Sequence, residues 1–313
     1  MRNPRMLAVG AAVLALLVSA CTPGGSESPN PSSGSPSTPA ELPSVIVGSA
    51  DFDESAIVAE LYAQALEAAG FEVERNLYLG PRETTLPAME SGDINLMPEY
   101  LGGLADGAGA ESSADPDETS ANLTDALVDR GLQVLAHSPA SDSDGFAVTA
   151  ETAEEFSLVT MTDLAGVADQ LIWGVPPECF GRELCELGLN EVYGIDLNAL
   201  TVENVGACSP ATAEALDAGA IQVGRVCTTQ PQIALYNLVV LEDDQGLNPA
   251  QNLVPLVTTE LAEAGGDLLA STLNAVSEHL TSEELIGLNL QVTVDQEDIA
   301  EVCQAWLEGQ GLL

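Results

Sequence analysis

Lysine is missing from this sequence of 313 residues. Its seven basic side chains are all arginines, and against 49 acidic residues they leave a formal net charge of −42 at pH 7. So strong a negative charge repels phosphate, which excludes nucleic acid as a partner. The acidity indicates a saline habitat, although a GC-rich genome also disfavours lysine. We therefore take the charge as a property of the protein's surroundings rather than of its ligand.

Histidine is scarce as well. The two histidines, His137 and His279, stand in no pattern typical of a catalytic triad, and the chain has neither a nucleophile–base pair nor a phosphate-binding loop. The six cysteines form no Cys-x-x-Cys pair, so their spacing does not predict a metal site. We expect a protein that is not an enzyme and that carries no cofactor or metal.

The N-terminus has the features of a secretory signal. Arg2 and Arg5 precede an apolar run, 6–18, which is too short for a membrane span, and small residues lead to Cys21. Cysteine in this position resembles a bacterial lipobox and predicts diacylglycerol on Cys21; the alternative is an ordinary signal peptide with an unrelated cysteine. We expect residues 1–20 to be the signal peptide and the Ser/Pro/Gly-rich residues 21–43 to be a flexible tether.

The rest of the chain is hydrophobic enough to fold. Residues of the hydrophobic class make up 46% of the sequence, and about 270 residues follow the tether. This length is large for one core, so we expect two lobes.

The stretch 45–103 predicts alternating strands and helices. A β-branched run at 45–47, an alternating run at 71–79 and a third strand at 94–97 are separated by helical patterns. This order favours a parallel sheet, in which ligands bind beyond the carboxyl ends of the strands. Those ends are the loops 48–52, 80–83 and 98–103.

The residues in these loops resemble those of a known family, the substrate-binding proteins of ABC importers for osmoprotectants such as glycine betaine, choline and proline betaine. The resemblance runs from about Val45 to the C-terminus. It rests on GSADFDES, LYAQALEAAGFEVE, LGPRE, AMESGDINLMPEYLGG and TTQPQIALYNLVVLEDD, of which PEYLGG and LVVLEDD are the most specific.

This resemblance implies an α/β fold of the type II periplasmic-binding-protein class. Its two lobes are each a mixed, mainly parallel sheet flanked by helices, and two crossings between the lobes form a hinge that closes around ligand. The first lobe would contain residues 44–140 and the C-terminal return 246–313, and the second lobe residues 141–245. The tail of the chain predicts helices at 267–280, 282–289 and 297–308.

The implied function is to capture a small osmoprotectant outside the cytoplasm. This solute would be a quaternary ammonium compound such as glycine betaine or choline. Delivery to ABC permease and ATPase subunits would follow, and we expect a monomer anchored to the membrane through its lipid. The alternative is a ligand-binding sensor domain for a small polar solute, which would need a fused output domain or a partner. An enzyme is the third class, and no residue pattern supports it.

A quaternary ammonium group donates no hydrogen bond, so it is held by aromatic faces and carboxylates. The family uses an aromatic cage, and the resemblance carries this role to Tyr100 first and to Phe52 second. Both have a simpler interpretation as core aromatics. Glu83 and Glu99 are acidic neighbours that could face a cation, but in so acidic a chain such neighbours are common.

A betaine also carries a carboxylate, which needs hydrogen-bond donors. Arg82 and Arg182 are expected at strand-end loops, where a guanidinium can hold a carboxylate through two parallel bonds; a surface ion pair is the competing use. Ser49, Thr228 and Thr229 supply hydroxyls at strand ends, where capping or turn bonding competes.

The sequence departs from the family around its cysteines. Cys179 stands where the family has phenylalanine, and Cys185 is a second departure, which together suggest a disulfide in an exported protein. Cys208 and Cys227 are expected at the same end of neighbouring strands and form a plausible second pair, which leaves Cys303 free.

Other departures affect the ligand site. Ala50 replaces a basic residue, Cys227 an aromatic one and Gln230 an acidic one, and aromatic residues make up only 4% of the chain. The predicted cage is therefore incomplete, and the ligand stays open among betaines, choline, ectoine and other small polar solutes.

Overall fold

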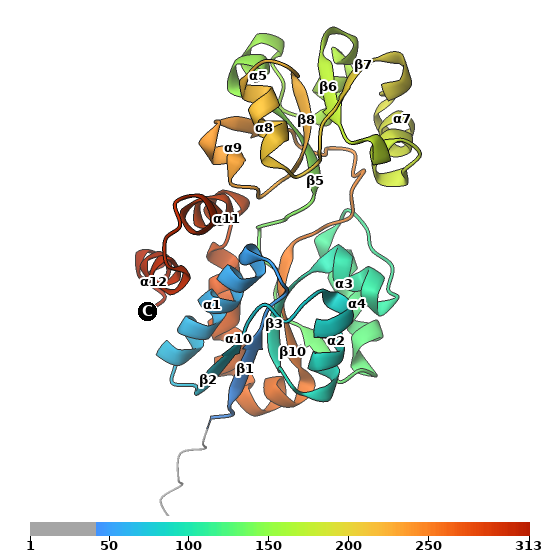
Figure 1. Ribbon diagram of the computed structural model, residues 1–313. Helices are drawn as coiled ribbons and strands as arrows, with labels where there is room; N and C mark the ends of the chain where they lie inside the picture. Colours follow the sequence, from blue (N-terminus) through green and yellow to red (C-terminus); the bar gives the residue numbers. More distant parts are fainter. Residues whose placement is uncertain (1–41) are drawn as a thin grey trace, which may run out of the picture. The chain divides into compact units, whose positions relative to one another are not determined.

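The computed structural model describes residues 42–313. The expected signal peptide, Cys21 and nearly all of the expected tether lie outside the described residues. Within them the strands form two sheets of five strands each (Figure 1). We call the part built on the first sheet the first lobe and the part built on the second sheet the second lobe.

The first sheet has the order β2-β1-β3-β10-β4. Strands β1, β2 and β3 are parallel, and β10 runs antiparallel to both β3 and β4. The bounds are β1 (Val45–Gly48), β2 (Val73–Asn76), β3 (Leu96–Tyr100), β4 (Leu132–Val134) and β10 (Leu253–Thr258). At the end of β1, a Cβ on Gly48 would lie 2.4 Å from Ile94 Cδ1, so glycine gives this side chain room.

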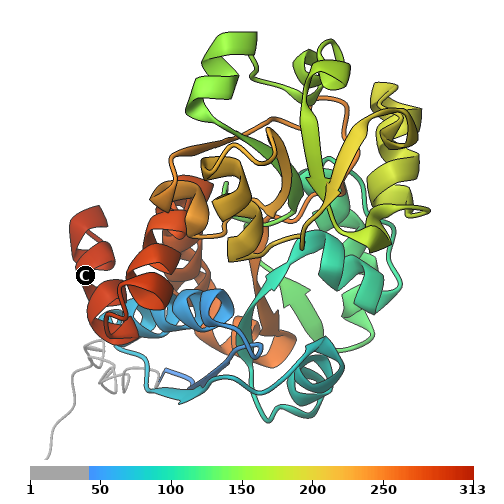
Figure 2. The same cartoon turned by 45° about the horizontal axis from the view of Figure 1, so that its top comes forward.

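Helices cover both faces of the first sheet. One face carries the long amphipathic helix α1 and the helices of the C-terminal return; the other carries α2, α3 and α4, each face with its own buried core. The bounds are α1 (Asp53–Ala68), α2 (Arg82–Ser91), α3 (Leu101–Ala108), α4 (Pro116–Val128), α10 (Thr259–His279), α11 (Ser282–Asn289), η5 (Leu290–Val294) and α12 (Ile299–Gln310). Figure 2 shows the tail helices, in red, against the blue α1, which agrees with their contacts.

Helix α10 begins earlier than the sequence predicts. We expected it to start at Asp267, but Thr258 at the end of β10 caps a helix that starts at once, its hydroxyl accepting from Leu261 N–H at 3.2 Å. Gly266 has φ of +53°, which interrupts the helix one residue before the predicted start. The predicted start, Asp267, is therefore the residue at which the helix continues after the break at Gly266.

The second sheet has the order β7-β6-β8-β5-β9, with β6 parallel to β7 and β8 and with β5 antiparallel to its neighbours. Its strands are β5 (Asp144–Thr149), β6 (Ile172–Val175), β7 (Thr201–Asn204), β8 (Val223–Cys227) and β9 (Leu238–Val240). Its helices are α5 (Ala150–Phe156), α6 (Met161–Ala165), η1 (Ala168–Gln170), η2 (Pro177–Cys179), η3 (Glu183–Leu187), α7 (Gly188–Tyr193), η4 (Leu197–Ala199), α8 (Pro210–Asp217) and α9 (Gln232–Leu235). Both sheets are mixed, as the fold class requires.

Two crossings join the lobes, and they pair with each other. Ser141 of the first crossing and Asn252 of the second form an antiparallel bridge, and Asp142 N–H donates to Gln251 O at 3.2 Å. Among residues 42–313, no helix is both long and apolar enough to span a membrane.

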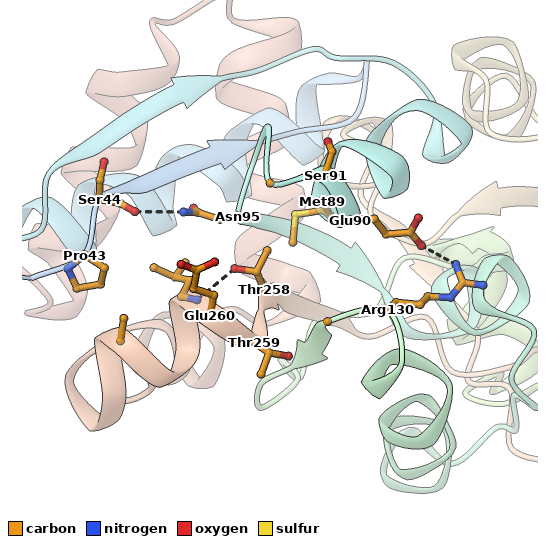
Figure 3. Close-up of a pocket in the computed structure, with 14 residues that line it drawn as sticks. Pro43, Ser44, Met89, Glu90, Ser91, Asn95, Arg130, Thr258, Thr259 and Glu260 are labelled. Carbon is orange, nitrogen blue, oxygen red and sulfur yellow. Dashed lines mark hydrogen bonds and ion pairs between the residues drawn. The ribbon is translucent and has the colours of Figure 1, made fainter.

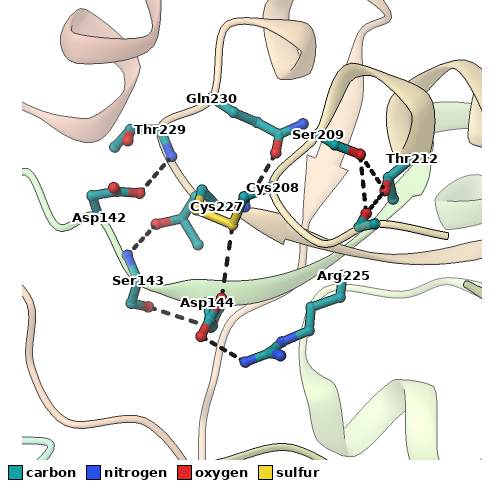
Figure 4. The surroundings of a disulfide bond; sticks show 12 residues. Asp142, Ser143, Asp144, Cys208, Ser209, Thr212, Arg225, Cys227, Thr229 and Gln230 are labelled. Carbon is teal, nitrogen blue, oxygen red and sulfur yellow. Dashed lines mark hydrogen bonds and ion pairs between the residues drawn. A yellow bond between two sulfur atoms is a disulfide. The ribbon is translucent and has the colours of Figure 1, made fainter. Parts of the chain in front are cut away.

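The second lobe contains two disulfides, Cys179–Cys185 and Cys208–Cys227, the same pairs that the sequence analysis proposed. The second one lies beside the first crossing, with Cys208 Sγ 3.8 Å from Asp144 Oδ1 (Figure 4). Cys303 is a free buried thiol. Because Cys208 and Cys227 are joined to each other, their sulfurs are not available as thiolate ligands for a metal.

Candidate functional site

A cavity of about 290 Å³ lies at the carboxyl ends of the parallel strands of the first sheet. The loops after β1 and before α2 line it together with the end of β3, because parallel strands bring their carboxyl ends to one edge. Four of the eight predicted binding residues line this cavity: Phe52, Arg82, Glu83 and Tyr100.

Two aromatic rings form one wall of the cavity. The ring centroids of Phe52 and Tyr100 are 6.2 Å apart with an angle of 31° between the planes, and 43% of Phe52 is exposed. The Tyr100 hydroxyl donates to Glu54 Oε1 at 2.5 Å, which fixes the ring. Paired aromatic faces with a carboxylate behind them are suited to a quaternary ammonium group.

Arg82 is committed to an ion pair within the same wall. Its Nε and Nη2 donate to the two carboxylate oxygens of Glu99 at 3.0 and 2.8 Å, and Glu99 is 3% exposed. Gly103 and Gly107 of α3 let it lie this close, since a Cβ at either position would come within 2.7–2.8 Å of the guanidinium or its Cδ. Arg82 therefore stabilises the strand end and has little capacity left for a ligand carboxylate.

Sequence reasoning missed two acidic residues next to this wall. Glu54, in the first turn of α1, is 8% exposed, and its Oε2 accepts from Asn289 Nδ2 at 2.6 Å. The same amide donates to Thr229 O at 3.0 Å, and Thr229 N–H donates to Asp142 Oδ1 at 3.3 Å. This chain of hydrogen bonds joins the first lobe, the tail helix α11 and the loop after β8.

The electrostatic effect of these acids shows in the pKa values of their neighbours. Burial, followed by the Glu54 and Asp142 carboxylates, raises the pKa of Tyr100 well above its usual range, so its hydroxyl stays protonated and donates. Burial and the charge of Glu54 raise the pKa of Asp142 to about 7.

Three predicted hydroxyl residues have structural bonds instead of free donors. Ser49 is fully buried, and its Oγ accepts from Tyr78 N–H at 2.8 Å and donates to Ala50 O at 2.9 Å. Thr228 Oγ1 accepts from Ser143 N–H and donates to Ser141 O, both at 2.9 Å, which ties the loop after β8 to the first crossing. Thr229 is 2% exposed, and both its backbone N–H and its side chain bond the Asp142 carboxylate.

Arg182 lies apart from the aromatic wall. It is exposed on the loop before η3, is not among the residues that line the cavity, and has no ion-pair partner within residues 42–313. The η3 segment that follows Arg182 does reach the hinge, since Leu184 of η3 and Asp142 line a second cavity of about 230 Å³. Whether the two lobes share the ligand through Arg182 stays a prediction.

A larger cavity of about 530 Å³ lies at the opposite edge of the first sheet (Figure 3). Its arginine and its asparagine are already partnered: Arg130 pairs with Glu90 at 3.1 Å, and Asn95 bonds Ser44 O and Ile46 N–H. It has no aromatic residue in its lining. The cavity at the carboxyl ends of the strands is therefore the better candidate.

Two lobes joined by paired crossings, with an aromatic cavity at the strand ends, define a solute-binding protein of the periplasmic-binding-protein class. The chain belongs to the family described as the substrate binding domain of ABC-type glycine betaine transport systems, whose model matches residues 43–309. Proteins of this family bind small solutes outside the cytoplasmic membrane, act with ABC permease and ATPase components, and are not enzymes.

Individual relatives agree with this assignment. The carnitine transport binding protein OpuCC of Listeria monocytogenes is 26% identical over 272 residues, covering 84% of this chain and 85% of that protein. A glycine-betaine-binding protein of Pseudomonas aeruginosa is 25% identical over 286 residues, 88% of this chain and 90% of that protein. The structure of apo YehZ from Escherichia coli has the same fold, with a TM-score of 0.79 at 22% identity over 86% of this chain and 99% of that one.

Proposed function

We propose that this chain binds a small quaternary ammonium solute, such as choline or glycine betaine, and delivers it to an ABC permease. The observation that carries the proposal is the Phe52–Tyr100 ring pair, whose inner ring is held by the buried Glu54 carboxylate. Aromatic faces and a desolvated carboxylate attract a cation that has no hydrogen to donate. The relatives named for carnitine and glycine betaine support the same ligand class.

The test is a calorimetric screen of choline, glycine betaine, carnitine, ectoine and proline against the purified chain. We expect saturable binding of at least one quaternary ammonium compound and weaker binding of proline, whose ring nitrogen presents hydrogen-bond donors that an aromatic cage does not satisfy. A preference for proline or ectoine over all quaternary compounds would contradict the proposed ligand class.

The alternative, a sensor domain for a small polar solute, shares this binding site and differs in its partner. Pull-down with the cognate permease and ATPase distinguishes the two functions. Stimulation of ATP hydrolysis in the reconstituted importer by the ligand-bound chain supports delivery to a permease, and a ligand-bound chain without effect on the importer favours the sensor.

We further propose that the protein is a monomer anchored to the membrane by diacylglycerol on Cys21. A Cys21→Ala variant should then leave the membrane fraction and appear in the soluble fraction, because one lipid-bearing residue supplies the hydrophobic anchor. Fractionation with immunoblotting measures this, with Cys303→Ala as the matched control. Retention of Cys21→Ala in the membrane would show that the apolar run at 6–18 is itself the anchor.

A further inference from the structure

Glu54 and Asp142 are two carboxylates that a chain of hydrogen bonds connects: Asn289 Nδ2 donates to Glu54 and to Thr229 O, and Thr229 N–H donates to Asp142. Within residues 42–313 neither has an ion-pair partner. Their hydrogen bonds come from neutral groups only: Tyr100 and Asn289 donate to Glu54, and Thr229 N–H donates to Asp142. Two ionised carboxylates in such a place repel each other and lack a compensating positive charge.

The charged groups around Asp142 do not supply that charge. Tyr100 at the end of β3 is a protonated phenol, and Asp144 on β5 is a third acid, whose own charge is taken up by Arg225 of β8 at 2.6 Å. The second crossing contributes Asn248 and Gln251 to the cavity that Asp142 lines, and both are neutral. Helix α11 contributes the Asn289 amide.

The cluster also connects residues of both cavities. Tyr100 lines the cavity with the aromatic wall, and Asp142 lines the one reached by Leu184 of the second lobe. Asp142 itself belongs to the crossing between the lobes, two residues before β5. A cation bound against Tyr100 would therefore lie at one end of the hydrogen-bond chain through Glu54, Asn289 and Thr229 whose other end is a carboxylate on the hinge.

We propose that the Glu54–Asp142 pair holds one proton when the site is empty and releases it when a cationic head group binds. The proposal rests on the function proposed above and adds that binding is an exchange of a proton for a quaternary ammonium group. No bond to the ligand forms; the proton leaves the Asp142 carboxyl for solvent, and the cation takes over the neutralisation of the ionised pair.

The direction of the pH dependence follows from the position of this equilibrium. The free protein carries Asp142 with a pKa of about 7, raised by burial and by Glu54. A cation binds better to the protein with Asp142 ionised. The affinity for the cation therefore rises as the pH rises through the pKa of Asp142, and it decreases as the pH is lowered. Between pH 8 and pH 6 a single group with this pKa changes the dissociation constant about tenfold.

Isothermal titration calorimetry with choline at pH 6, 7 and 8 tests the proposal, since choline keeps its charge of +1 throughout. Titrations in pairs of buffers that hold the same pH but differ in ionisation enthalpy count the released protons, with phosphate and Bis-Tris at pH 6 and phosphate and Tris at pH 7 and 8. We expect the dissociation constant at pH 6 to be about ten times that at pH 8, with close to one proton released per choline at pH 6 and about 0.1 at pH 8.

The Asp142→Asn variant keeps the size of the side chain and its acceptor for Thr229, so its choline affinity should be independent of pH. Asp125→Asn, which removes one exposed charge on α4, is the matched control and should keep the wild-type profile. Choline binding at pH 8 with no pH dependence, or an Asp142→Asn profile like that of wild type, overturns the exchange and leaves the proposed function intact. Absence of binding for every quaternary compound at pH 8 overturns the proposed function itself.

Discussion

The two lobes differ in what fixes the loops at the ends of their strands. In the first lobe, noncovalent bonds hold these loops: the ion pair of Arg82 with Glu99, the Tyr100–Glu54 bond and the Asn289 amide. In the second lobe both disulfides do so, and no disulfide joins residues of the first lobe between positions 42 and 313. At its strand ends the first lobe thus presents aromatic and acidic side chains, whereas the strand-end loops of the second lobe are cross-linked by disulfides.

This contrast suggests a division of work. A cation site needs exposed rings next to desolvated carboxylates, and hydrogen bonds can hold such groups while they still respond to ligand. A lobe that closes onto the site needs loops that keep their shape during the movement. The Cys208–Cys227 disulfide fixes the loop after β8 next to the first crossing (Figure 4). The Thr228 side chain adds a hydrogen bond to Ser141 O of that crossing.

The largest effect that would test this contrast is loss of the second disulfide. Replacing both Cys208 and Cys227 by Ala should lower the free energy of unfolding of the second lobe by about 3 kcal/mol, and replacing Cys179 and Cys185 by about 2 kcal/mol, because the shorter loop costs less entropy to close. The cysteines are 19 and 6 residues apart. Urea unfolding measures the change.

The two tryptophans make this measurement specific to each lobe. Trp173 is fully buried in the core of the second lobe, and Trp306 packs against the core of the first, with its Nε1–H donating to Glu284. Variants with Trp306→Phe or Trp173→Phe then follow one lobe each. An equal loss of unfolding free energy in the two lobes would contradict the view that the disulfides stabilise the second lobe specifically.

Cys303, whose thiol pKa is raised by burial, is the free cysteine of the folded part. In a chain that begins after Cys21, it should be the one thiol that reacts after denaturation without reductant.

The second effect concerns the aromatic wall of the first lobe. Tyr100→Ala should weaken choline binding by about 1–2 kcal/mol, because it removes a cation–aromatic contact and leaves Glu54 without one of its donors. Tyr100→Phe keeps the ring and should lose less. Calorimetry at pH 8 measures both, and Tyr78→Ala, which removes an exposed ring outside the cavity, is the matched control. Wild-type affinity in Tyr100→Ala would show that the cavity is not the binding site.

The sequence was sufficient to predict the loops that line this cavity. Alternating strands and helices place the carboxyl ends of parallel strands at one edge, so the loops with Phe52, Arg82, Glu83 and Tyr100 were expected to meet there. The Cys208–Cys227 pair was expected for the wrong reason: β6 lies between β7 and β8 in the second sheet, so these cysteines are not at the ends of neighbouring strands, and the loop after β7 brings Cys208 to the end of β8 instead. In the first sheet, the local sequence pattern and the order of the strands therefore predict the same loops.

The Glu54 network could not be predicted in the same way. Glu54 and Asn289 are 235 residues apart, and their bond depends on how the tail helix returns to α1. With 49 acidic residues in the chain, the identity of Glu54 or Asp142 gave no signal; the burial of Glu54 and the hydrogen bonds of both acids with Asn289 and Thr229 distinguish them from the solvated acids. The hydroxyls of Ser49 and Thr228 were expected at the ligand, but turn and hinge bonds occupy them, because short polar side chains find backbone partners first.

The smallest effect concerns Arg182, where the two lobes would share one ligand. Arg182 is exposed and has no ion-pair partner within the described residues, so it is free to meet a ligand carboxylate when the lobes close. Because it is exposed, the contact should be weakened by solvent, and Arg182→Ala should reduce glycine betaine affinity by only about threefold. Choline has the same head group and no carboxylate, so its affinity should not change. Arg182→Lys, which keeps the charge and loses the two-pronged geometry, should lie between wild type and Arg182→Ala for glycine betaine. Calorimetry of both ligands at low and high salt measures this, and the difference between them should shrink as salt rises. Equal losses for choline and glycine betaine would show that Arg182 acts on the protein and not on the carboxylate, which would leave ligand recognition to the first lobe and the hinge.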